Sequence, residues 1–117
     1  MARRRYVPDR GDFVWLNLNP RRGHEQAGRR PALVLSPKSY NRTTGLCVIC
    51  PATRQEKGYA FEVGIETADG HESVILADHV RSVDWRARKV SLDCQVEAAV
   101  LEEVVAKLFA LIVEPDG

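Results

Sequence analysis

One short stretch, HEQAGRRP at residues 24–31, gathers the side chains best suited to proton transfer and phosphate binding. It places an imidazole, a carboxylate and two guanidiniums just before the apolar run 32–35. Glu25 can take a proton from a hydroxyl, and Arg30, which the following proline restrains, can neutralise the charge of a phosphate. A base beside phosphate-binding cations suits the cleavage of a phosphodiester, so we interpret residues 19–30 as a functional loop between two strands.

A second stretch, PATRQEKGYAFEV at residues 51–63, offers groups that complement the first. Thr53 supplies a hydroxyl, and Arg54 and Lys57 add positive charge nearby. Tyr59 and Phe61 carry aromatic rings of the kind that stack on unpaired bases. Together these side chains favour a single-stranded nucleic acid as the ligand.

Basic and acidic residues are unevenly divided along the chain. Residues 1–60 hold 12 Lys and Arg against 4 Asp and Glu, and residues 61–117 hold 5 against 12, which gives +8 and −7 within a net charge of +1. Such an asymmetry indicates a basic surface for a polyanion, although a fold that interleaves the two halves would cancel the field. A solvated charged face is the alternative interpretation of the charge alone.

The elements that must position these groups are mostly short strands. Apolar runs bounded by turn residues predict strands over 12–18, 31–36, 46–51, 61–65, 73–80 and 88–92. From Val96 onward the apolar positions recur roughly every three to five residues, which predicts an amphipathic helix over 94–113 with Asp93 as its cap. The 117 residues therefore predict one mainly β domain, a small antiparallel barrel with a C-terminal α-helix, which begins with a basic arm at residues 1–10.

Cysteine content and hydropathy narrow the class of protein. The three cysteines are an odd number, and we see neither an export signal nor an apolar run long enough to span a membrane, so we expect reduced thiols and a cytoplasmic location. Cys47 and Cys50 have a CxxC spacing, but in a strand they point to opposite faces and cannot share a metal ion. We expect no metal site and no cofactor, and we expect Trp15 and Trp85 in the core or at a subunit interface.

Over nearly its whole length the chain resembles a known family of toxins. The run RYVPDRGDFVWLNLNPRRGHEQAGRRPALVLSPKSYN is followed in order by TGLCVICPATRQEKGYAFEV, by ILADHVRSVDWRAR and by the terminal helix. These segments, from Arg5 to Ile112, closely resemble the MazF/PemK family of bacterial toxin endoribonucleases, also called mRNA interferases. The motifs GxEQAGxRPALVLS and PxTxxxKGYxFEV, which carry the resemblance, are long and distinctive.

This resemblance implies a fold, a reaction and partners. It implies an SH3-like barrel of the MazF/CcdB type, a homodimer, and a cognate MazE-like antitoxin that covers the RNA site with an acidic segment. The implied reaction is metal-independent cleavage of single-stranded RNA, such as mRNA, at a short motif that we expect to contain ACA. Attack by the 2′-hydroxyl would leave a 2′,3′-cyclic phosphate and a 5′-hydroxyl.

Glu25, Arg30 and Thr53 match the catalytic residues of the family. We expect Glu25 to be the general base, Arg30 to stabilise the charge of the transition state and Thr53 to hydrogen-bond a nonbridging oxygen. His24 is either a proton donor or a solvated loop residue, and Arg86 either extends the RNA groove or covers a barrel edge. The full set of residues that we expect to bind RNA is Arg29, His24, Gln26, Arg54, Lys57, Tyr59, Phe61 and Arg86.

Two other functions remain open on the sequence. The first is that of a CcdB-like toxin, which binds gyrase and cuts nothing. Such toxins rely on a C-terminal tryptophan, whereas this chain ends with ALIVEPDG. The second is a noncatalytic RNA-binding barrel, which needs the basic groove and the aromatic side chains but tolerates the loss of Glu25.

Overall fold

The computed structural model describes residues 5–18, 28–67 and 69–113. His24, Glu25 and Gln26 lie outside the described residues. Along the described chain the elements are β1 (Asp12–Asn17), β2 (Arg29–Val34), α1 (Lys38–Thr44), β3 (Leu46–Thr53), β4 (Glu62–Glu66), β5 (Glu72–Leu76), β6 (Arg81–Asp84), β7 (Ser91–Gln95) and α2 (Ala98–Ile112). Neither of the two helices in these ranges has the length and apolar character needed to cross a membrane.

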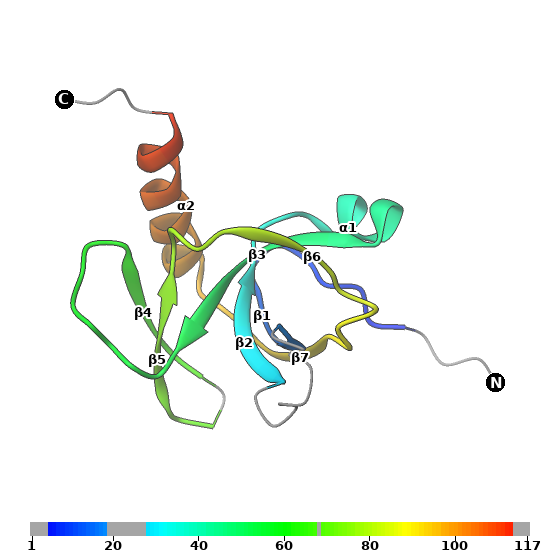
Figure 1. The fold of residues 1–117 in the computed structure, drawn as a ribbon, viewed down its shortest axis with the longest axis horizontal. Helices are drawn as coiled ribbons and strands as arrows, with labels where there is room; N and C mark the ends of the chain where they lie inside the picture. The colour runs from blue at the N-terminus through cyan, green and yellow to red at the C-terminus, as the bar shows by residue number, and fades with distance from the viewer. Residues whose placement is uncertain (1–4, 19–27, 68, 114–117) are drawn as a thin grey trace.

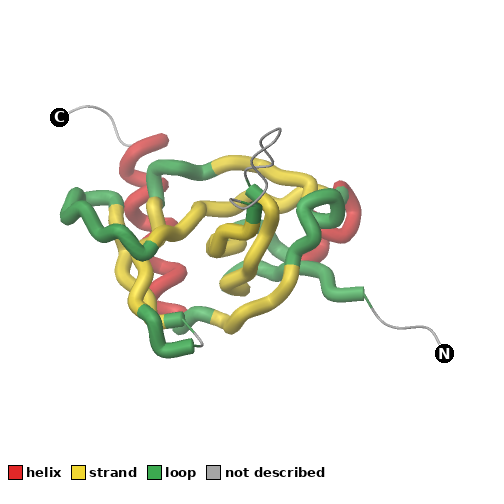
Figure 2. Tube along the Cα trace, turned by 60° about the horizontal axis from the view of Figure 1, so that its bottom comes forward, coloured by secondary structure: helices red, strands yellow, loops and turns green. Residues whose placement is uncertain are grey.

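The strands form one antiparallel sheet that curls into a half-barrel (Figures 1 and 2). Its strand order is β4–β5–β3–β2–β1–β7, and β6 also pairs with β3. β3 connects the parts of the sheet, because it pairs with β2 on one edge and with β6 and then β5 on the other. The predicted fold class, a mainly β SH3-like barrel with a C-terminal helix, is confirmed.

Alternate residues of the central strands enter two different cores. One core lies beneath α2 and includes Phe13, Cys50 and Val104. The other lies on the opposite face of the sheet and surrounds Cys47 and Trp85. The apolar runs of β1, β2 and β3 are therefore covered on both faces, as strands without polar alternation should be. Burial raises the pKa of both cysteine thiols to about 12, so they stay neutral core groups.

The structure adds a short helix and a strand that the sequence did not predict. α1 has no apolar stripe, and its fully buried residue is the polar Asn41. The Asn41 side chain donates to the carbonyls of Pro8 and Ser36 at 2.7 and 3.0 Å, and the Trp85 indole donates to the Asn41 carbonyl at 2.9 Å. These hydrogen bonds, rather than helix propensity, hold α1 in place. The strand predicted over 73–80 ends at Leu76, where the His79 N–H donates to the Leu76 carbonyl at 3.0 Å and closes a turn, and β6 follows as a separate strand.

Both ends of the chain differ from the prediction. The C-terminal helix begins at Ala98, not at residue 94, because β7 continues through Gln95. Asp93 therefore lies within β7 and does not cap the helix, whose N-cap is Glu97. Within the N-terminal stretch, Arg10 donates its Nε–H to the Leu35 carbonyl at 2.8 Å, and the Asn41 side chain donates to the Pro8 carbonyl at 2.7 Å. Ile112, the last residue of the C-terminal helix, is 66% exposed.

Candidate functional site

A groove of about 660 Å³ opens at the end of the sheet where β1 and β3 finish and β2 begins. Four arginines face it, and its described lining contains no carboxylate. The residues that line it are Trp15, Leu18, Arg29, Arg30, Pro31, Pro51, Ala52, Thr53, Arg54, Gln55 and Arg81. We call it the basic groove. A concave site lined by several guanidiniums attracts a polyanion.

Arg30 and Thr53 both line the basic groove, from adjacent strands. β2 and β3 are antiparallel and pair from Val34 opposite Ile49 to Ala32 opposite Pro51. Arg30 precedes the end of this pairing on β2 by two residues, and Thr53 follows it on β3 by two residues. Two of the three predicted catalytic residues therefore line the same groove, although 23 positions (53 − 30) separate them in the sequence.

The Thr53 hydroxyl and the Arg30 guanidinium are both free to donate hydrogen bonds into the groove. The Thr53 hydroxyl oxygen accepts the Gln55 N–H at 3.2 Å, which leaves its own proton for another acceptor. The Arg30 side chain forms no hydrogen bond or ion pair with any residue in the described part of the chain. A guanidinium stays charged at neutral pH, so Arg30 offers fixed positive charge and a planar set of donors.

Arg29 is held by neutral acceptors. Its guanidinium donates to the Asn17 side chain at 3.3 Å, to the Trp15 carbonyl at 3.0 Å and to the Ser91 hydroxyl at 2.8 Å. These contacts fix its orientation across β1 and β7 without a carboxylate partner. Arg29 therefore keeps its full charge at the groove, while most of its donors are already occupied.

The described residues on either side of the predicted functional loop lie at the basic groove. Leu18 and Arg29, which flank residues 19–27 closely, both line the groove. The Leu18 N–H donates to the Gly28 carbonyl at 3.0 Å, and Arg88 donates to the Asn17 carbonyl at 2.9 Å. The anchor points of the predicted functional loop thus lie at the groove, whereas the positions of His24, Glu25 and Gln26 themselves lie outside the described residues.

Arg54 is paired with an acidic turn. Its guanidinium lies 3.3 Å from the Asp69 carboxylate, and both side chains are about half exposed. Asp69 also accepts hydrogen bonds from the Thr67 hydroxyl and, at 3.1 Å, from the His71 N–H. The Thr67 and His71 hydrogen bonds hold the pKa of the Asp69 carboxyl below its ordinary value, and Arg54 adds a smaller effect in the same direction. Asp69 therefore remains ionised at neutral pH and offsets part of the charge of Arg54.

Four other predicted RNA-binding residues within the described part of the chain do not line the basic groove: Lys57, Tyr59, Phe61 and Arg86. Lys57 is exposed on the loop after β3. Tyr59 donates its hydroxyl to the Asp78 carboxylate at 3.2 Å, and Phe61 is partly buried against the core beneath α2. Arg86 stacks on Trp85, with its guanidinium carbon 4.8 Å from the ring centroid. Their binding of RNA stays a prediction.

Among the groove residues that were not recognised from the sequence as site residues are Trp15 and Arg81. Trp15, expected in the core or at an interface, is partly exposed and lines the groove. Arg81 begins β6 opposite Ile49 of β3, which brings it to the groove from a distant part of the chain. In the sequence, the only indication that Arg81 belongs to the site is its place in the motif ILADHVRSVDW. The pairing of β6 with β3 is what shows that Arg81 lies at the groove.

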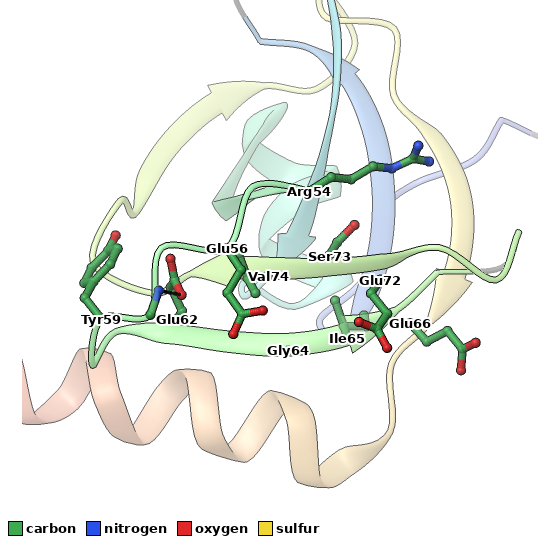
Figure 3. A pocket seen from close by; sticks show the side chains of 11 residues that line it. Arg54, Glu56, Tyr59, Glu62, Gly64, Ile65, Glu66, Glu72, Ser73 and Val74 are labelled. Carbon is green, nitrogen blue, oxygen red and sulfur yellow. Dashed lines mark hydrogen bonds between the residues drawn. The ribbon is translucent and has the colours of Figure 1, made fainter.

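A second hollow, of about 590 Å³, lies beside the loop after β3 and along β4 and β5 (Figure 3). Its wall carries Glu56, Glu62, Glu66 and Glu72 and one cation, Arg54, which also lines the basic groove. We call it the acidic hollow. Among the described residues, no three of His, Cys, Asp and Glu gather in a way that could hold a metal ion.

Comparison with known proteins identifies the family. Residues 9–112 match the family described as PemK-like, MazF-like toxin of type II toxin-antitoxin system. The chain is 47% identical over 108 residues to the Endoribonuclease toxin MazF of Escherichia coli K12, covering 92% of this chain and 96% of that one. It is 32% identical to the Endoribonuclease PemK of Escherichia coli, covering 96% of this chain and 87% of that one.

Solved structures agree with the sequence relatives. A crystal structure of MazE-MazF (Form-II) from Deinococcus radiodurans matches with a TM-score of 0.86 and 52% identity, covering 95% of this chain and all of that one. A crystal structure of MazF (Form-I) from the same organism matches with a TM-score of 0.82 and 54% identity, covering 92% and 98%. The chain therefore belongs to the PemK-like, MazF-like toxin family of type II toxin-antitoxin systems.

Proposed function

We propose that this toxin is an endoribonuclease that binds single-stranded RNA in the basic groove and cuts it there. The observation that supports the proposal is that Arg30 and Thr53 line one groove, whose described lining holds four arginines and no carboxylate. Such a site supplies charge and hydrogen bonds to a phosphodiester, and several related chains are named as endoribonucleases. We expect the toxin to act in the cytoplasm, where mRNA is its substrate.

The proposed reaction is transesterification within the RNA. The 2′-oxygen forms a bond to the adjacent phosphorus while the bond from phosphorus to the 5′-oxygen breaks. Glu25 accepts the proton of the 2′-hydroxyl, and the 5′-oxygen takes up a proton from His24 or from water. The products are a 2′,3′-cyclic phosphate and a 5′-hydroxyl, so the reaction consumes no water.

Arg30 and Thr53 would stabilise the charge that builds up on the phosphorus. Arg30 lies in the groove without a described partner, so its donors are available to the nonbridging oxygens. The Thr53 hydroxyl, whose oxygen already accepts the Gln55 N–H, donates its proton to one of the same oxygens. No step of this scheme needs a metal ion, so we expect cleavage without one. The recognised motif is expected to be short and to contain ACA.

The proposed partners are a second copy of the chain and an antitoxin. α2 presents an apolar outer face on which Val105, Phe109 and Leu111 are 42%, 57% and 51% exposed, which suits a homodimer. A cognate MazE-like antitoxin with an acidic segment would complement the basic groove, and MazE-MazF is the subject of solved structures in the family. We treat residues 1–117 as a single toxin domain.

The proposal is tested by cleavage in the absence of free metal. The purified toxin and its Glu25→Ala variant are incubated with mixed-sequence single-stranded RNA in excess EDTA, and the cut sites and ends are mapped. Site-specific cuts that end in a 2′,3′-cyclic phosphate and disappear in the variant are the expected result. A metal-independent activity that the variant retains would contradict the role of Glu25.

The same experiment separates the alternative functions. A protein that binds the RNA and leaves it intact, with no change in Glu25→Ala, would be a noncatalytic RNA-binding barrel. A folded protein that neither binds nor cuts RNA would point to a protein target such as gyrase. Binding by Glu25→Ala that is at least as tight as wild type, without cleavage, would support the nuclease.

A further inference from the structure

We propose that Glu62 is a positioning residue for RNA binding, because its carboxylate fixes the loop that runs from Arg54 to Phe61. This inference rests on the proposed function. The loop connects β3 to β4 and carries Arg54 and Gln55 at the basic groove, followed by Lys57 and Tyr59. None of its residues is part of a helix or strand, so its path depends on hydrogen bonds from outside the loop.

The Glu62 carboxylate caps two successive backbone N–H groups of the loop. One oxygen accepts the Lys57 N–H and the other accepts the Gly58 N–H, each at 2.8 Å. Figure 3 shows Glu62 beside Tyr59 at one end of the acidic hollow. Gly58 has a φ of +82°, a conformation that residues with a Cβ rarely adopt. One carboxylate therefore stabilises a tight turn through two charge-assisted hydrogen bonds.

Glu62 itself is anchored on both sides. It is the first residue of β4, where it pairs with Leu76 of β5, and its N–H donates to the Tyr59 carbonyl at 3.2 Å. Its carbonyl accepts a hydrogen bond from the Lys107 amino group of α2 at 3.0 Å. The loop turn is thereby tied to the sheet and to the C-terminal helix through one residue.

Loss of this cap should weaken RNA binding without slowing the chemical step. Arg30 and Thr53 belong to β2 and β3, whose ladder does not depend on Glu62. A loop that samples several paths is in its binding-competent form for only part of the time, so the apparent affinity falls by that fraction. Glu62 thus lowers KM because it holds the loop in its binding-competent form. A variant without this cap should keep a kcat close to that of the wild type.

The test is the Glu62→Gln variant of the full chain, assayed with an oligonucleotide that contains a cut site mapped for the wild type. The amide retains the size of the side chain but turns one acceptor into a donor that faces an N–H. Loss of a charge-assisted hydrogen bond predicts a KM about tenfold higher, a kcat within about threefold, and exchange of the Lys57 and Gly58 amide hydrogens at least about tenfold faster.

Glu66→Gln is the matched control. Glu66 lies on the same strand and the same hollow, and no hydrogen bond joins it to residues 54–61, all of which the structure describes. This variant makes the same change in charge, so it should keep the KM and amide exchange of the wild type. Gly58→Ala perturbs the turn while Glu62 is kept, and it should also raise KM because of its positive φ.

The outcomes separate the role of Glu62 from the function itself. A wild type that cuts no RNA would overturn the proposed function. A wild type that cuts, with KM and amide exchange unchanged in Glu62→Gln, would overturn the role of Glu62 alone, as would a fall in kcat at constant KM. Circular dichroism shows whether Glu62→Gln folds. If it does not, the Gly58→Ala variant tests the proposal instead, and a KM of Gly58→Ala equal to that of the wild type contradicts it.

Discussion

The basic groove and the acidic hollow are of similar volume and share Arg54, yet they carry opposite charge. The groove presents four arginines and no carboxylate along its described lining, whereas the hollow presents four glutamates. The groove is built mainly from residues 15–55, and the hollow from residues 54–74. Although strands of the two halves of the sequence pair with one another, the charge asymmetry of the chain is not cancelled at these two neighbouring surfaces, which carry opposite charge.

The two regions also differ in how they hold their charges. Arg30 and Arg81 have no partner among the described residues, and Arg29 is held by neutral acceptors only. In the hollow, the Glu62 carboxylate binds the backbone of the adjacent loop. Free cations in the groove suit a ligand that brings phosphates, while the carboxylates of the hollow repel the same ligand and direct it to the groove.

Replacement of Arg30 is expected to have the largest effect. Arg30→Ala removes an unpaired guanidinium from the groove and should reduce the single-turnover rate of cleavage by roughly 10²–10³-fold. Arg42→Ala, on the exposed last turn of α1, removes the same charge away from the groove and should cut at the rate of the wild type. Equal rates for the two variants would mean that total charge, not the groove, governs cleavage.

Arg81→Ala should weaken RNA binding with a smaller effect on the chemical step. Arg81 reaches the groove from β6 and lies there beside Arg30 and Thr53. Removal of one phosphate contact should lower the slope of log affinity against log salt by about 0.7 for a single strand. The measurement is a salt titration of binding to RNA that lacks the reactive 2′-hydroxyl, and an unchanged slope would show that Arg81 contacts no phosphate.

Asp69→Asn should strengthen RNA binding, because it releases Arg54 from its carboxylate partner. The pair is about half exposed, so we expect a gain of about two- to fivefold, measured by titration at low salt. The pKa of Asp69 is lowered, which means that the carboxylate stays charged at and above its usual titration range. The gain should therefore be equal at about pH 6 and pH 8. Weaker binding by the variant would show that Asp69 orients Arg54 for RNA.

Glu66→Gln should have the smallest effect. Glu66 lies opposite Glu72 in the ladder of β4 and β5, so two like charges are neighbours. Neutralising one of them should raise the thermal midpoint slightly, by relief of at most about 1 kcal/mol, while the cleavage rate changes by less than about twofold. A marked loss of cleavage would show that the acidic hollow takes part in the reaction.

The apolar strands and half of the candidate site could be predicted from the sequence because their signals are local. Runs such as LCVICP stay apolar on both faces, and both faces of β3 are indeed covered. Arg30 and Thr53 were singled out by residue type and by family motif, and both line the basic groove. The roles of Glu25 and His24 remain predictions, since both lie outside the described residues.

The remainder depends on contacts between distant segments. α1 is held by the buried side chain of Asn41, and no local pattern marks a polar residue as a core residue. Arg81 enters the groove only because β6 pairs with β3. The capping role of Glu62 becomes visible only when the turn at Gly58 folds back onto β4.

The most direct test is to locate bound RNA on the protein by NMR. A single-stranded RNA that contains the mapped cut site, with the reactive 2′-hydroxyl replaced by hydrogen, is titrated into the labelled toxin. The account predicts that the amide signals of Arg30, Thr53 and Gln55 shift, while those of Gly64, Ile65 and Glu66 stay in place. Shifts concentrated along β4 and β5, with Arg30 and Thr53 unaffected, would contradict the assignment of the basic groove as the RNA site.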